Sequence, residues 1–160
     1  MNRHEREVRS TERIFEILDQ SKICRLAMHD ENGEIYILPM NFGYEVFPDD
    51  GLRLWFHGAP RGKKLSLLKQ NPKVGFEMDC NVQIIESASL CSYSYTYMSL
   101  VGKGKAVLVD DDDYPQKNKA LKFVLAHQAN VHGVDLPEAK VRGVGVFYVD
   151  VEELSGKERM

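Results

Sequence analysis

Residues 54–65, LWFHGAPRGKKL, hold the end of a strand, a glycine-containing turn and the start of a helix. From Leu52 to His57 every second side chain is aliphatic or aromatic and falls on one face of a strand. Gly58 ends that strand, and we expect a helix from about Arg61 to Lys69. The stretch therefore predicts a strand that runs through a tight turn directly into a helix.

The same turn gathers groups that bind anions. It points free backbone N–H groups, the positive end of the helix and the ammonium groups of Lys63 and Lys64 at one spot, as a phosphate monoester needs. It is not a Walker A loop, because Gly58 and Gly62 are one residue too close and Lys64 stands where Ser or Thr would bind magnesium. A turn followed by a solvated basic helix explains the spacing equally well.

Other parts of the chain alternate in the same way and are rich in Val, Ile, Tyr and Phe. We expect these strands over residues 23–29, 35–44, 73–79, 92–109 and 141–149. Asn32-Gly33 is a strong hairpin signal, and residues 47–51 contain a second turn. Six strands joined in part by tight turns predict an antiparallel sheet that closes into a barrel.

Two further helices flank these strands. Ser10-Thr11 can cap a helix that reaches about Gln20, with Ile14, Ile17 and Leu18 on its apolar face. Another helix follows the four aspartates 110–113, with Pro115 in its first turn and Leu121, Val124 and Leu125 on one face. We interpret the aspartates as a helix start rather than a cation site.

The fold class is therefore mainly β with flanking helices, in a single domain over residues 1–160 with its core at about 11–155. Met1–Arg9 and Gly156–Met160 are expected to be frayed ends.

Composition excludes several classes of protein. The 160 residues are 43% hydrophobic and 28% charged, as in an ordinary soluble domain. The net charge of −3 argues against a nucleic-acid partner. No apolar run reaches the ~20 residues of a membrane span, and from the charged N-terminus we expect no signal peptide. Cys24, Cys80 and Cys91 are expected as reduced thiols outside any site, in a cytoplasmic protein.

Two further places are candidates for a ligand contact. His57 ends its strand beside the anion-binding turn, where it is either a ligand contact or an ordinary surface histidine. Pro39 cannot donate to a strand ladder, so residues 38–43, which include Met40, Asn41 and Phe42, are expected to form a strand edge or a bulge. With Asn41 and Gly43 in it, this segment is either a barrel corner or a place where the backbone approaches a ligand. His127 and His132 lie five apart, off the spacing of a helical zinc pair, and we expect no metal site.

Several segments together resemble one family. ICRLAM (23–28), ILPMNFGY (37–44), LWFHGAPRGKKLSLL (54–68), NPKVGFEMD (71–79) and YMSLVGKGKA (97–106) are similar, in this order, to the pyridoxamine 5′-phosphate oxidase-like flavoproteins. The similarity is greatest to the nitroimidazole-resistance, nitroreductase-like branch. It implies an FMN-binding split β-barrel that works as a homodimer, with the flavin at the subunit interface.

The resemblance also implies a set of site residues. It places Met40, Asn41 and Phe42 along the isoalloxazine ring system. It places four further residues along the edge of the flavin: Phe56, His57, Gly58 and Ala59. The phosphate would be held by Gly62, Lys63 and Lys64. Ser99 would complete the contacts with the phosphate or with the ring. His57 would lie next to flavin and substrate as the catalytic residue. One departure is Met98, where the family strand carries an arginine before its serine.

The resemblance therefore predicts an FMN-dependent oxidoreductase that reduces a small acceptor. It suggests a nitroaromatic compound, such as a nitroimidazole, as that acceptor. NAD(P)H would visit transiently, since no Rossmann fingerprint is present. A non-catalytic FMN-binding, storage or sensor protein is the alternative. A haem or deazaflavin binder, with His57 or His127 as a possible axial ligand to haem, is less favoured because the lysine-rich turn suits a phosphate.

Overall fold

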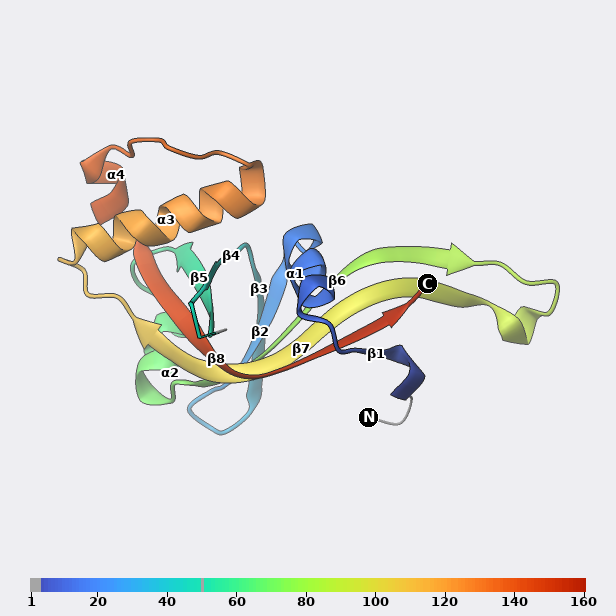
Figure 1. Cartoon of the computed structure of the whole chain (residues 1–160). Helices are drawn as coiled ribbons and strands as arrows, with labels where there is room; N and C mark the ends of the chain where they lie inside the picture. The colour runs from blue at the N-terminus through green and yellow to red at the C-terminus, as the bar shows by residue number, and fades with distance from the viewer. Residues whose placement is uncertain (1–3, 50) are drawn as a thin grey trace.

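One antiparallel sheet forms the centre of the computed structural model, which describes residues 4–49 and 51–160 (Figure 1). Its eight strands are β1 (Glu7–Val8), β2 (Cys24–His29), β3 (Ile35–Met40), β4 (Gly43–Val46), β5 (Leu52–Gly58), β6 (Lys73–Ile85), β7 (Ser94–Leu108) and β8 (Gly145–Arg159). The helices are α1 (Thr11–Gln20), α2 (Lys63–Gln70), α3 (Tyr114–Ala129) and α4 (Glu138–Arg142), with short 3-10 turns η1 (His4–Arg6) and η2 (Leu90–Ser92).

The strand order is β3-β2-β6-β7-β8-β5-β4, with β1 paired to β8. No described strand joins β3 to β4, so the sheet curls without closing, and the mainly β split-barrel prediction is confirmed. The expected strand over 35–44 is two strands, because the chain leaves the ladder at Asn41 and Phe42. With β1 added, the expected six strands become eight.

Both ends of the chain are more ordered than expected. β8 pairs with β7 as far as Arg159, and β1 pairs with β8 at Lys157 and Gly156. The prediction of frayed ends is therefore wrong for the described residues of both segments, and residues 1–3 lie outside the description. Asp50 of the expected turn lies outside it too. β8 begins at Gly145 rather than at Val141, which lies in α4.

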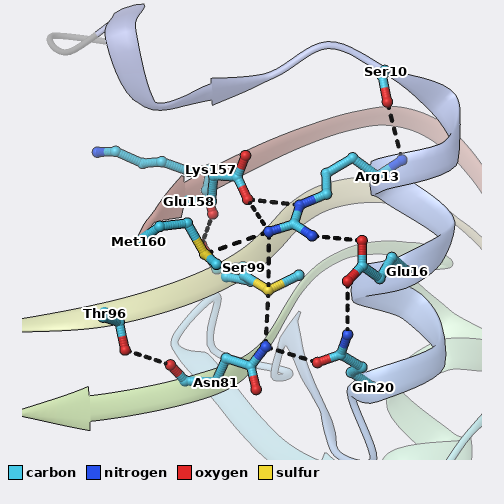
Figure 2. A network of polar contacts seen from close by, with 11 residues as sticks. Ser10, Arg13, Glu16, Gln20, Asn81, Thr96, Ser99, Lys157, Glu158 and Met160 are labelled. Atoms are coloured by element: carbon cyan, nitrogen blue, oxygen red, sulfur yellow. Dashed lines mark hydrogen bonds and ion pairs between the residues drawn. The ribbon is translucent and has the colours of Figure 1, made fainter.

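A polar network ties α1 to the end of β8 (Figure 2). The Arg13 guanidinium donates to Glu158 at 2.7 Å and to Glu16 at 2.5 Å. Ser10 caps the helix by accepting from the Arg13 backbone N–H, as the sequence predicted. The C-terminal strand is thus held by a half-buried charge cluster and by its ladder.

β5 is buried on both faces. Leu54 and Phe56 point into the main core, where Phe56 stacks on Phe147 at 5.0 Å between ring centroids. Trp55 points the other way and packs under α3 with Val124 and Ala120. Successive side chains of β5 therefore enter two different apolar clusters, the main core and the cluster under α3, instead of alternating between core and solvent.

The aspartates before α3 act as a helix start, as predicted. Asp113 is the N-cap and accepts from the backbone N–H of Gln116 at 3.0 Å. Asp111 forms an ion pair at 3.2 Å with Lys117, whose side chain is fully buried. Val124 is buried as expected, whereas Leu121 and Leu125 are only half-buried. Across residues 4–49 and 51–160, no helix has the length and apolar character of a membrane span.

Beyond a bulge between Cys80 and Gln83, β6 and β7 continue as a two-stranded ribbon that projects away from the barrel (Figure 1). We call residues 81–96 the arm. The sequence placed the end of β6 at Asp79, whereas the strand reaches Ile85. Each strand is thus shared between the barrel and the arm.

We expect Gly43→Ala to lower the free energy of unfolding by about 1–3 kcal/mol, the usual cost of overpacking. A Cβ at Gly43 would collide with the α3 backbone at Phe123 and Val124. The control is Gly75→Ala in β6, where the nearest atoms to a Cβ are 3.9 and 4.0 Å away. Urea denaturation measures both, and equal midpoints would show that α3 does not rest on Gly43.

Candidate functional site

The candidate site lies where the two ends of the strand order, β3 and the β4–β5 pair, approach one another. We call it the seam; it comprises β3, residues 41–42, residues 56–62 and the first turn of α2. The Lys63 ammonium of α2 lies 4.7 Å from the ring centroid of Tyr36 on β3 and 3.9 Å from the Asp30 carboxylate. Phe42 and Phe56 approach to 6.4 Å between ring centroids. Segments that are distant in strand order therefore border one place.

Both sides of the seam carry strand edges without a neighbour. Among the described strands, β3 pairs only with β2. The β4–β5 ladder stops at Gly43 and Trp55, so residues 56–58 continue past β4 while pairing with β8 on their other side. Unpaired edges present backbone N–H and C=O groups. A planar ligand with polar edges can pair with such groups.

His57 is half-buried at the end of β5. Burial, and secondly the positive charge of Lys64, lower the pKa of His57 below its ordinary value of 6.5. The imidazole is consequently neutral at pH 7 and offers one N–H donor and one nitrogen acceptor. The Lys64 ammonium lies over Gly58, where any Cβ would collide with it. Glycine at 58 thus allows the lysine to approach the backbone beside His57.

The start of α2 is open. Gly62 is the N-cap with φ +134°, and no side chain caps the first turn. A Cβ at Gly62 would meet no atom within 4 Å, so there is room above the helix N-terminus. Lys63 and Lys64 diverge from this point, one toward Tyr36 and the other over Gly58. Such a terminus flanked by two cations fits a phosphate group.

The segment 40–42 contributes less side chain to the seam than the resemblance implied. Phe42 is fully buried, and so is Phe56, so both side chains belong to the core. Met40 is nearly buried. Asn41 is exposed, and its amide donates to Gln128 at 3.1 Å and to the Lys22 carbonyl at 3.4 Å. The backbone of this segment and the Asn41 side chain remain available to a ligand, as does the exposed Ala59 at the turn.

Ser99 does not meet these residues within one chain. Its hydroxyl donates to the Lys157 carbonyl at 3.3 Å. Leu108 is the β7 residue nearest the His57 end of the sheet. Ser99 lies nine positions before Leu108, and nine residues of extended strand span roughly 30 Å. Met98 is fully buried, and its sulfur accepts from Asn81 at 3.1 Å and from Arg13 at 3.6 Å.

His127 has a structural role that the sequence did not indicate. Its Nδ1 lies 2.8 Å from the Phe42 carbonyl oxygen, and its Nε2 lies 2.9 Å from the Leu18 carbonyl oxygen. It therefore links the seam segment to α1. The partners are 85 and 109 positions away in the chain, so no local pattern around His127 could have revealed them.

The remaining nucleophiles and metal ligands offer no competing site. Burial raises the pKa of the Cys24 thiol to about 12 and also raises that of half-buried Cys80. Cys91 is exposed at the arm tip. The described residues contain no group of three His, Cys, Asp or Glu side chains able to hold a metal ion.

We expect Lys64→Met to raise the pKa of His57 toward 6.5, because the substitution removes a nearby positive charge. Lys63→Met is the matched control, since its ammonium lies over Tyr36 instead. An NMR titration of the imidazole measures the difference. An identical pKa in both variants would contradict the placement of Lys64 beside His57.

Comparison with known proteins agrees with this architecture. A family model described as pyridoxamine 5′-phosphate oxidase matches residues 10–158. A candidate 5-nitroimidazole antibiotic resistance protein from Bacteroides thetaiotaomicron is 28% identical, with a TM-score of 0.79 over 95% of this chain and 86% of that one. No curated protein sequence matches.

More distant structures share the fold alone. A flavocytochrome from Azotobacter vinelandii is 18% identical, with a TM-score of 0.77 over 100% of this chain and 72% of that one. An FAD-binding protein from Mesorhizobium loti is 22% identical, with a TM-score of 0.67 over 97% and 98%. Since the family model spans nearly the whole described chain, this chain belongs to the pyridoxamine 5′-phosphate oxidase family.

Proposed function

We propose that the chain binds FMN along the seam and acts as an oxidoreductase that reduces a small acceptor, with a nitroaromatic such as a nitroimidazole as the candidate. The observation that carries the proposal is the meeting of neutral His57, the open Gly62 turn and two diverging lysines at one strand end. Family membership and the similarity to a candidate nitroimidazole resistance protein support it.

The residues present fit this cofactor. The phosphate of FMN matches the Gly62 helix start, where Lys63 and Lys64 can form charge-assisted hydrogen bonds. The ring system matches the free backbone edges of residues 40–42 and 56–59. A haem ligand from His127 is disfavoured, because both of its ring nitrogens already face carbonyl oxygens.

FMN, when bound, would supply the electron transfer, and the chain would supply position and exclusion of water. The neutral His57 can orient an acceptor through its N–H. It can give up a proton only after it has been protonated, and that form is lost as pH rises through the lowered pKa. Both forms of the imidazole carry an N–H, so an orienting role leaves activity unchanged as His57 titrates, whereas a proton-donating role gives activity that falls as pH rises through the lowered pKa.

The proposed active form is a cytoplasmic homodimer of single-domain subunits. Ser99 lies roughly 30 Å along β7 from the His57 end of the sheet in its own chain, so we propose that it completes the site of the second subunit. NAD(P)H is proposed as a transient electron donor, and no nucleic acid is expected to bind. The alternative is a flavin-binding, storage or sensor protein without turnover. The buried Met98 favours it, because this strand lacks the family arginine.

The FMN site predicts a phosphate-specific effect of the lysines. We expect Lys63→Met and Lys64→Met each to weaken FMN binding about tenfold or more, the worth of one charge-assisted hydrogen bond, and to leave riboflavin binding unchanged. Lys69→Met, in the last turn of α2, is the control. Flavin fluorescence titration gives both affinities. A protein that binds neither flavin, or variants that lose both equally, would refute the phosphate assignment.

The catalytic role predicts a selective effect of His57. We expect His57→Ala to lower the reduction rate of a nitroimidazole by about 10²–10⁴-fold with FMN still bound. Steady-state NAD(P)H oxidation measures it, and an unchanged rate would exclude the role. Flavin that binds tightly yet never turns over in the unaltered protein would instead establish the storage alternative.

A further inference from the structure

The last turn of α3 is tied to the seam through Gln128. α3 packs against β4 and β5 (Figure 1), and Gln128 is its second-last residue. The Gln128 amide nitrogen donates to the Phe42 carbonyl at 2.8 Å and to the Lys22 carbonyl at 3.2 Å. Lys22 lies just before β2 and Phe42 just after β3. One side chain of α3 therefore holds the chain on both sides of the β2–β3 hairpin.

The direction of the Gln128 amide follows from these two partners. A carbonyl oxygen accepts hydrogen bonds and cannot donate one, so the two N–H groups of Gln128 face the Phe42 and Lys22 carbonyls. Gln128 Oε1 is left as an acceptor on the other side of the amide, and the Asn41 amide nitrogen donates to it at 3.1 Å. Backbone carbonyls thus decide which end of the Gln128 amide meets Asn41.

The same argument fixes the direction of the Asn41 amide. Its nitrogen faces Gln128 Oε1 and, at 3.4 Å, the Lys22 carbonyl, and both of these groups are acceptors. Asn41 Oδ1 consequently lies on the opposite side of the amide. Asn41 is exposed, and within residues 4–49 and 51–160 no group donates to this oxygen. The seam therefore holds one hydrogen-bond acceptor whose direction is set from α3.

We propose that Gln128 is a positioning residue for the cofactor, which holds the Asn41 amide so that Asn41 Oδ1 accepts a hydrogen bond from a ring N–H. The ring system of an oxidised flavin has one such group, the imide N–H between its two carbonyls. The inference deepens the proposed function and rests on it. Gln128 lies 87 positions beyond Asn41 in the chain, so no local pattern around Asn41 indicates this role.

The inference predicts selectivity for a ring that has a free imide N–H. A flavin whose imide nitrogen carries a methyl group cannot donate there, and it leaves Asn41 Oδ1 without a partner. We expect the unaltered chain to bind FMN at least about tenfold more tightly than imide-methylated FMN, which is the worth of one hydrogen bond. Titration of flavin fluorescence with each compound gives the two dissociation constants and hence their ratio.

Substitution of Gln128 tests the positioning role. Gln128→Met keeps the length of the side chain and removes its amide, so we expect the ratio of the two dissociation constants to fall at least about threefold. Asn41→Ala removes the acceptor itself and should lower the ratio at least as much. Gln116→Met, in the first turn of α3, is the matched control and should leave the ratio unchanged. Circular dichroism confirms that each variant folds.

A double variant separates positioning from direct contact. If Gln128 acts through Asn41, Gln128→Met should change the ratio no further once residue 41 is alanine. The protein without flavin gives a second readout. In its ¹H–¹⁵N NMR spectrum, the side-chain amide signals of Asn41 should shift in Gln128→Met and stay in place in Gln116→Met.

Several outcomes would overturn the inference. They are an unchanged ratio in Gln128→Met, additive effects in the double variant, and an equal loss of affinity for both compounds, which would show a purely structural clamp. An unaltered chain that binds FMN and imide-methylated FMN equally well would refute the inference and leave the proposed function standing. A chain that binds neither compound would refute both.

Discussion

The long pairing of β7 with β8 is the constraint on which the rest of the structure depends. It runs from Leu108 opposite Phe147 to Tyr97 opposite Arg159 and is the only described ladder between the β3-β2-β6 side of the sheet and the β5-β4 side. Glycines keep this ladder close, since a Cβ at Gly104 would collide with the Asp150 carbonyl and one at Gly102 with the Glu153 carbonyl. Because the two sides are joined along one line only, their far edges can approach without pairing, and the seam lies between those edges.

The electrostatics of the seam follow from how the chain crosses it. β5 carries His57 to the edge while its Leu54 and Phe56 remain in the core, so the imidazole is only partly removed from water. α2 begins five residues beyond Gly58, and its two lysines then lie on either side of the open turn. Positive charge beside a partly buried imidazole favours the neutral form of the imidazole. The same charges would attract a phosphate, so cofactor affinity and the protonation of His57 share one cause.

Those parts of the fold and the site that depend on neighbouring residues in the chain were predictable from the sequence. The Ser10 cap, the Asp113 cap and the strand-turn-helix over residues 54–65 depend on neighbours within a few positions, and the structure agrees. Predictions about the ends failed because nothing local distinguishes a frayed end from a strand with a distant partner. β1 pairs with residues about 150 positions away, and β8 needs the Arg13 cluster from α1.

The sequence by itself therefore determined the periodicities, the caps, the glycine turn and the chemical types at the candidate site, because these follow from side-chain size, hydrogen bonding and charge along a few residues. Only the tertiary structure decided which of them meet. It buried Phe42, Phe56 and Met98, turned Lys63 away from Lys64, gave His127 two carbonyl partners and separated Ser99 from the His57 end of the sheet. Such outcomes depend on how far a twisted sheet curls before its edges meet, which is a property of all its strands together and of no single segment.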